Sequence, residues 1–215
     1  MFKPQLLGGG GESTSTSVLN ITGSNAIVDW VHIEIRSAAN YNLLLATKNA
    51  LLQRDGDIVS STDGVSPLLF TGLPAGNYYI SVKHRNHLGV MMANAISLSL
   101  GTLSYANFTN MPLHVVPSIV NNTPAKMSGS IQTLWSGDPN YNKNVKYNGM
   151  LNDKDPILIS VGISTPNNTV YGYRLEDLNM DGKVRYNNTD NDRAIILNNV
   201  GVTTTNKILS QHTPN

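Results

Sequence analysis

The sequence predicts a mostly β protein with a small α domain: an antiparallel β-sandwich followed by a pair of loop–helix units. Two observations predict this arrangement. Short runs with strand-like patterning, separated by turn residues, fill residues 18–116. Residues 137–162 and 176–201 are two copies of one pattern, in which a loop rich in Asn and Asp precedes a short helical stretch. Strands and helices thus occupy separate stretches, unlike the alternation typical of a βαβ fold.

The 215 residues divide by composition into four parts. Residues 1–17 contain a Gly/Ser/Thr-rich run and are expected to form a flexible linker. Residues 18–116 form the predicted sandwich, and residues 117–130, with two prolines and little periodicity, form a connector. Residues 131–215 form the domain that holds the repeat. A chain of this length can bury one large core or two small ones.

The first strand of the predicted sandwich is the run AIVDWVHIEI, which carries apolar residues on both faces, as a strand buried on both sides does. Turn signals rich in Gly, Pro and Asp follow at regular spacing. Further strand candidates are YNLLLATKNALL, DIVSS, SPLLFTGL, NYYISVKHR and NAISLSLG, and the turn signals are Asp55-Gly56, Asp63-Gly64, Pro74-Ala75-Gly76 and His87-Leu88-Gly89.

Composition excludes several classes of function. The net charge is +1, which gives no reason to expect nucleic acid or an anionic membrane surface as partner. Only 13% of the residues are charged, against about 25% in average globular proteins, so Asn, Ser and Thr must make the surface polar. There is no Cys, and no apolar run reaches the roughly 18 residues of a membrane span. No Ser-His-Asp order, paired Glu or phosphate-binding Gly loop is present, so an enzyme is not expected.

The repeat aligns without a gap at a constant step of 39 residues. Residues of the same type recur at this step through the loop and the helix, which indicates two copies of one supersecondary unit. The matched pairs are Asp138/Asp177, Asn140/Asn179, Val145/Val184, Tyr147/Tyr186, Asn152/Asn191, Asp153/Asp192, Leu158/Leu197 and Gly162/Gly201.

The second copy has the spacing of a calcium-binding loop. Asp177, Asn179 and Asp181 stand at positions 1, 3 and 5, Gly182 at the sharp turn of position 6, and Lys183 at position 7, which contributes a backbone carbonyl. Calcium takes six to eight oxygen ligands, so alternating oxygen-bearing side chains suit it.

The acid that should close this loop at position 12 is absent, because Asn188 stands there. Asp192, at position 16, is directly followed by the helical pattern RAIILNNVG, with Gly201 as its predicted stop. We therefore expect a loop longer by four residues, with Asp192 as closing ligand and as cap of the helix, and with Asn191 as the alternative closing residue.

The first copy offers fewer charges. Lys143 replaces the glycine of position 6, and two carboxylates stand against three in the second copy, so weaker binding is expected at the first loop. The alternative for both loops is a set of Asx turns without metal. The candidate ligands of the first loop are Asp138, Asn140, Asn142, Asn144 and Asp153, and one or two structural calcium ions are expected in all.

Other polar and aromatic residues favour structural roles. His84 and His87 lie three apart near a strand end, so their side chains should diverge. Asp55, Asp57 and Asp63 are explained more simply as turn residues than as a cation site. Tryptophans and tyrosines could offer stacking surfaces for sugars, but Trp30 is expected in the core and Trp135 packed between the repeats; the tyrosines in question are Tyr78, Tyr79, Tyr147 and Tyr186.

Resemblances to known families rest on these motifs. The duplicated loop and helix, with DLNMDGKVRY at its centre, resembles the dockerin domain, which implies attachment to a protein partner or a cell-surface scaffold. The run GLPAGNYYISVKH resembles the strand of prealbumin-like and Ig-like modules. Together with NAIVDWVHIEIR, these motifs look like the C-terminal region of large exported proteins of Bacteroidetes-type bacteria.

That resemblance implies an extracellular or cell-surface location and a non-catalytic role for a fragment of a longer exported protein, since the N-terminus lacks the pattern of a signal peptide. The alternatives are a carbohydrate-binding adhesin and an ancillary region of a secreted hydrolase.

Overall fold

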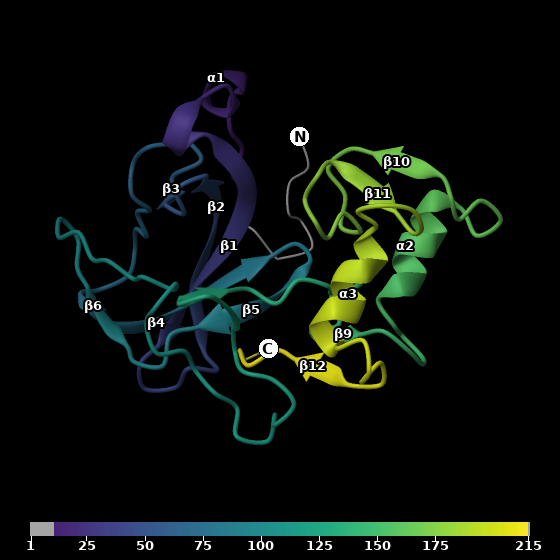
Figure 1. Ribbon diagram of the computed structural model, residues 1–215. Coiled ribbons are helices and arrows are strands. Elements are labelled where there is room, and N and C mark those ends of the chain that lie inside the picture. Colours follow the sequence, from purple (N-terminus) through teal and green to yellow (C-terminus); the bar gives the residue numbers. More distant parts are fainter. Residues whose placement is uncertain (1–10, 215) are drawn as a thin grey trace. The chain divides into compact units, whose positions relative to one another are not determined.

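The computed structural model describes residues 11–214 (Figure 1). The chain is mostly β with antiparallel sheets and few helices, which confirms the predicted class. The described residues form two compact units: residues 11–85, 91–114 and 213–214 make the first unit, and residues 86–90 and 115–212 make the second. Of the predicted linker, residues 1–10 lie outside the described residues, and a one-turn helix α1 (Thr16–Leu19) occupies its end.

Five strands of one six-stranded antiparallel sheet make up most of the first unit, and four of the five residues of its strand β5 (His87–Met91) belong to the second unit. Its order is β3-β2-β1-β4-β5, and β6 also pairs with β4. The two-sheet form of the predicted sandwich stays a prediction. The strands are β1 (Ile27–Ser37), β2 (Leu44–Gln53), β3 (Ile58–Val59), β4 (Gly76–His84), β5 (His87–Met91) and β6 (Ile96–Leu98).

Two local predictions in this unit were wrong. The predicted turn at residues 87–89 is instead part of β5, because the hairpin turns at Arg85 and Asn86, which carry no Gly or Pro signal. The predicted strand SPLLFTGL has no strand structure: Leu69 is exposed, and its carbonyl accepts a hydrogen bond from Lys48 Nζ at 2.7 Å.

The central strand β1 is buried on both faces, as predicted, but four of its buried side chains are polar. Glu34 accepts hydrogen bonds from Arg36 Nε at 2.9 Å and from Lys83 Nζ of β4. His32 Nδ1 lies 2.9 Å from Asn49 Oδ1 on β2. These partners offset the cost of removing charged and polar groups from water, so this half of the strand is held by a satisfied polar network.

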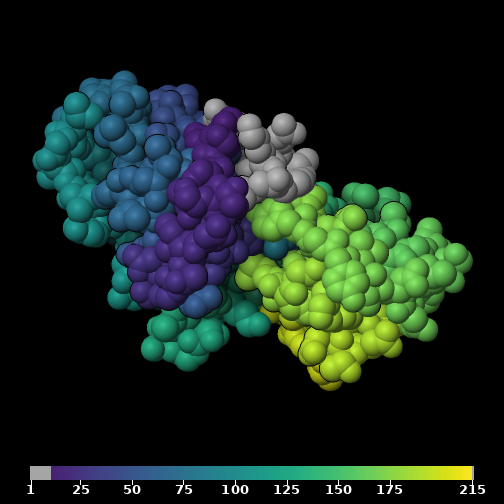
Figure 2. Space-filling model, turned by 90° about the horizontal axis from the view of Figure 1, so that it is seen from above, coloured from purple at the N-terminus to yellow at the C-terminus, as the bar shows by residue number. Residues whose placement is uncertain are grey.

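A small apolar cluster closes the end of the sheet under α1. Val18 of α1 packs with Trp30, Leu51 and Val59, so Trp30 is a core residue, as expected. Ser15 caps the helix by accepting the N–H of Val18 at 3.3 Å. Figure 2 shows this N-terminal segment, in purple, lying on the surface of the first unit.

The second unit is built from the repeat, which runs further than the sequence pattern indicated. Each copy is a strand, a helix and a second strand, and every element of one copy has its counterpart 39 residues on. The first copy consists of β9 (Asn144–Lys146), α2 (Lys154–Val161) and β10 (Thr169–Tyr171), and the second of β11 (Lys183–Arg185), α3 (Asp192–Val200) and β12 (Ile208–Ser210). A separate hairpin, β7 (Lys126–Ser128) with β8 (Ile131–Thr133), lies ahead of them, within and just after the predicted connector.

The two copies exchange strands. The strand that follows the first helix pairs with the loop strand of the second copy, Val170 opposite Val184, and the strand that follows the second helix pairs with the loop strand of the first, Leu209 opposite Val145. Figure 1 shows α2 and α3 beside each other with these strand pairs at their ends. Because the registers are equivalent, neither copy can complete its sheet without the other.

The core of this unit repeats as well. Six of its buried members form pairs 39 residues apart, Val145/Val184, Ile157/Ile196 and Val161/Val200, so the two helices and two loop strands pack around one pseudo-twofold centre. Trp135 is packed against this core, as expected. The buried residues are Leu88, Val145, Ile157, Val161, Leu178, Val184, Ile196, Val200 and Leu209.

Candidate metal centre

The two candidate loops share one backbone conformation. Four equivalent positions in each loop have left-handed backbone angles. At position 6, Lys143 has φ +67° and Gly182 has φ +80°. A residue with a side chain is strained in this region of backbone angles, whereas glycine is not. Lys143 therefore adopts the same turn as Gly182 at a cost in free energy. The remaining equivalent pairs are Tyr141/Met180, Gly149/Asn188 and Leu151/Asp190.

The carboxylate at position 1 organises each loop from inside. Asp138 accepts the backbone N–H groups of Asn142 and Lys143 at 3.0 and 2.8 Å. Asp177 accepts the N–H groups of Asp181 and Gly182 at 3.1 and 3.0 Å. Both aspartates are buried, so each carboxylate lies inside its loop rather than in solvent.

The side chains at positions 3 and 5 bond to the loop backbone. Asn140 Oδ1 accepts the N–H two residues on at 3.1 Å, and Asn142 Oδ1 accepts that of Asn144 at 2.9 Å. In the second loop, Asn179 Oδ1 accepts the N–H of Asp181 at 3.1 Å and Asp181 Oδ1 accepts that of Lys183 at 2.9 Å. These are the Asx turns that the alternative interpretation predicts, and they are also the way in which a cation loop presents its oxygens.

Asp153 and Asp192 close the two loops at position 16. Asp153 Oδ2 accepts the N–H of Lys146 at 2.6 Å, and Asp192 Oδ2 accepts that of Arg185 at 2.8 Å. Both side chains are fully enclosed, at 0% exposure. The aspartate at position 16 therefore bonds back to the residue at position 9 in each loop, and position 16 is where the sequence predicts the closing residue.

The predicted capping role of Asp192 was wrong. Asn191 is the cap of α3, since its Oδ1 accepts the N–H of Ala194 at 3.0 Å, and Asn152 does the same for Asp155 at 3.1 Å at the start of α2. An Asn ahead of the helix satisfies free N–H groups, which leaves the following Asp turned into the loop.

The predicted stop of α3 at Gly201 is confirmed. Its φ of +99° and its N–H bond to Leu197 O at 2.9 Å end the helix.

The buried carboxylates resist ionisation. Burial raises the pKa of Asp153 to about 8, and the nearby charge of Asp138 adds to the rise. Burial also raises the pKa of Asp138 to about 6, and that of Asp192 to about 6 with a contribution from Asp177. In the first loop, two carboxylates that favour the neutral form therefore lie near one another, and in the second loop Asp192 favours the neutral form beside Asp177.

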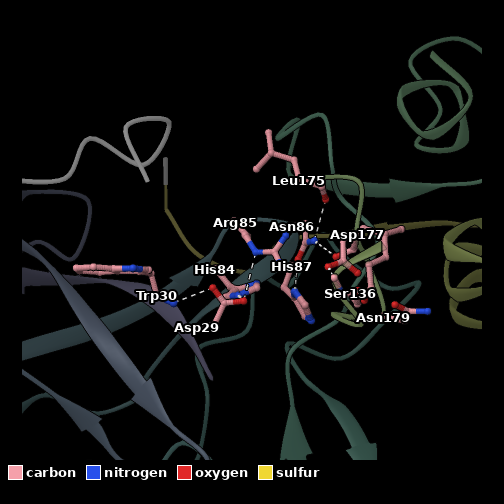
Figure 3. Close-up of polar contacts among 12 residues, drawn as sticks. Asp29, Trp30, His84, Arg85, Asn86, His87, Ser136, Leu175, Asp177 and Asn179 are labelled. Atoms are coloured by element: carbon pink, nitrogen blue, oxygen red, sulfur yellow. Dashed lines mark hydrogen bonds and ion pairs between the residues drawn. The ribbon is translucent and has the colours of Figure 1, made fainter. Parts of the chain in front are cut away.

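A residue outside the repeat joins the two loops. Asn86, fully buried, donates from Nδ2 to the carbonyls of Leu175 and Asp177, both at 2.8 Å, at the start of the second loop (Figure 3). Its own carbonyl accepts the N–H groups of Gly137 and Asp138, both at 3.0 Å, at the start of the first. Sequence reasoning missed Asn86, because a single Asn in a hairpin turn carries no pattern.

The other polar candidates have structural partners. Within the first unit, His84 Nε2 lies 3.0 Å from Asp29 Oδ2, which also accepts from Arg85 (Figure 3). Within the second unit, His87 Nδ1 lies 2.8 Å from the side-chain oxygen of Asn86.

The aspartates of the first unit's turns behave as turn residues. Asp63 accepts bonds from Val65 and Ser66, and Asp55 accepts the N–H of Asp57 at 3.3 Å.

The carboxylates of the loops come in pairs rather than in larger groups. Among residues 11–214, no group of three or more His, Cys, Asp or Glu side chains is arranged to hold a metal ion. In the second loop, Asp181 Oδ2 instead pairs with Arg185 Nη1 at 2.8 Å. Ligands beyond each carboxylate pair would therefore have to come from amide and backbone oxygens.

Comparisons with protein-family models, with curated proteins and with solved structures find no match for this chain. Within the described residues, no helix is long and apolar enough to cross a membrane.

Proposed function

We propose that this chain is a non-catalytic module of an exported protein, in which the duplicated loops take calcium as a structural ion and the module mediates attachment to a protein partner. The observation that carries the proposal is the pair of buried, mutually close aspartates inside each loop.

A divalent cation would offset the charge of such a pair when both carboxylates are ionised. Desolvation and mutual repulsion disfavour two ionised carboxylates in one enclosed loop. A bound cation removes both costs, because it supplies opposite charge and direct ligands at the same place. Folding and cation binding would then be coupled.

The residues present fit a hard cation that prefers oxygen. Asp153 keeps one buried oxygen free of any hydrogen bond among residues 11–214, and the neighbouring side chains are amides, whose oxygens calcium accepts. The chain would use Asp138, Asn140, Asn142, Asn144 and Asp153 in the first loop, and Asp177, Asn179, Asp181, Lys183 and Asp192 in the second.

The attachment role rests on resemblance. A duplicated calcium loop followed by one helix is similar to the dockerin domain, and the β-rich first unit suits the Ig-like or prealbumin-like sandwich module proposed for residues 18–116. This favours a cell-surface scaffold as partner and an extracellular location.

Thermal unfolding of the full chain, with calcium and with a chelator, tests the calcium part. We expect the transition of the second unit to move up with calcium, since a ligand that binds only the folded state stabilises it. Magnesium at equal concentration is the control for ionic strength. Superimposable curves in calcium and chelator would eliminate the structural ion.

A glycan array separates the attachment proposal from its alternative. Specific, saturable glycan binding by the full chain would favour the carbohydrate-binding adhesin over a protein-attachment module.

A further inference from the structure

The two closing aspartates differ at one oxygen. Asp192 Oδ1 accepts the backbone N–H of Leu178 at 2.7 Å and that of Asn179 at 3.4 Å. Asp153 Oδ1, its counterpart, is buried and has no hydrogen-bond partner among residues 11–214. Leaving a buried carboxylate oxygen without a donor costs more free energy than forming the bond would gain.

A single sequence difference removes the shorter of these two hydrogen bonds from the first loop. Position 2 of the loop, which supplies the donor in the second copy, is Leu178 there and Pro139 in the first copy. Proline has no backbone N–H, so position 2 of the first loop cannot donate a hydrogen bond to Asp153 Oδ1. The Oδ2 atoms of Asp153 and Asp192 accept equivalent hydrogen bonds, so the two side chains differ in the bonding of Oδ1.

The charged side chains at position 9 add to the difference. Arg185 pairs with Asp181 and so supplies the second loop with its own countercharge. Lys146, the counterpart of Arg185, instead donates from Nζ to the carbonyl of Met150 at 2.7 Å. The position-5 residue of the first loop is Asn142, which brings no charge of its own. The first loop therefore differs from the second in holding a buried carboxylate oxygen without a hydrogen bond among residues 11–214.

We propose that the first loop is the principal cation site, with Asp153 Oδ1 as a direct ligand, and that the second loop is closed mainly by its own backbone. This inference rests on the proposed calcium binding and reverses the order that the number of carboxylates predicts. Asp192 Oδ1 would have to share its lone pairs between an ion and two N–H groups, whereas Asp153 Oδ1 accepts no hydrogen bond among residues 11–214.

Calcium titration of the full chain by calorimetry, with matched substitutions, tests the inference. Asp153→Asn should lower the affinity of the tighter site by about tenfold or more, and Asp192→Asn should leave that affinity within about threefold. Loss of the tighter site in Asp192→Asn, with its retention in Asp153→Asn, would overturn the inference and leave the proposed function standing. Absence of calcium binding by the unchanged protein would overturn both.

Pro139→Ala gives a test that does not depend on removing a carboxylate. It restores an N–H at position 2, so the chelator-treated protein should melt at a higher temperature while the rise caused by calcium becomes smaller. Pro117→Ala, at an exposed proline of the same unit, controls for the general effect of losing a proline. An unchanged calcium response in Pro139→Ala would contradict the role given to Asp153 Oδ1.

Discussion

The enclosed Asp153 carboxyl makes the stability of the calcium-free protein depend on pH in a definite direction. Its folded-state pKa is raised to about 8 by burial, from an ordinary value near 4. A raised pKa means that the folded state binds the proton more tightly than the unfolded chain does. The stability that this group contributes is therefore fully present below about pH 4 and is lost as pH rises through about 8.

The magnitude can be isolated between about pH 6 and about pH 8. Asp138 and Asp192 have pKa values of about 6, so most of what they contribute to the free energy of unfolding is already lost when the pH passes 6. As the pH rises from about 6 to about 8, Asp153 alone should lower the free energy of unfolding by about 1.4 kcal/mol per pH unit, or about 3 kcal/mol over this window. His32 and His114, whose pKa values burial lowers, add an opposite slope below about pH 6.5.

Urea unfolding in the presence of a chelator measures this slope. Far-ultraviolet circular dichroism follows the second unit, because α2 and α3 supply most of the helix. The Asp153→Asn variant should lose the slope between about pH 6 and about pH 8, while the histidine contribution stays equal in both proteins. Equal slopes in the two proteins, or a stability that rises with pH only in the unchanged protein, would refute the reasoning about Asp153.

Further predictions concern unfolding free energies measured by urea titration in calcium. Lys143→Gly should stabilise the protein by about 1 kcal/mol, because φ at this position is +67°; a loss of stability would contradict the strain assigned to it. Asn191→Ala should cost about 1 kcal/mol by removing the cap of α3, and an unchanged midpoint would show that another group caps the helix. Asn86→Ala should cost about 3 kcal/mol, since it removes the side-chain donor from one buried and one partly buried carbonyl; a cost below about 1 kcal/mol would argue against its joining of the loops. Glu34→Ala should cost about 3 to 5 kcal/mol, because it leaves the buried Arg36 without its carboxylate, and a neutral result would mean that the network relaxes.

The repeat and most of the strands could be predicted from the sequence, because both depend on patterns of neighbouring residues. The constant 39-residue step identified the equivalent residues of the two loops. The structure adds that the strands after the helices repeat too, and that each pairs with the loop strand of the other copy. That exchange pairs residues such as Val145 and Leu209, whose separation no local pattern encodes.

The features that could not be predicted from the sequence depend on contacts between residues far apart in the chain. The difference between Pro139 and Leu178 is plain in the alignment, but it gains meaning only when the position-2 N–H is found to bond the closing aspartate. The joining role of Asn86 is of the same kind, because it spans about 90 residues of sequence. The cap was misassigned between neighbours, Asn191 and Asp192, since both residue types favour that position.

Amide hydrogen exchange of the full chain, with and without calcium, tests the central claim most directly. Calcium should raise protection in β9, β10, β11 and β12, whose pairing connects the two loops, and should leave protection in β1, β2 and β4 of the first unit unchanged. Exchange that is the same with and without calcium throughout the repeat would contradict it.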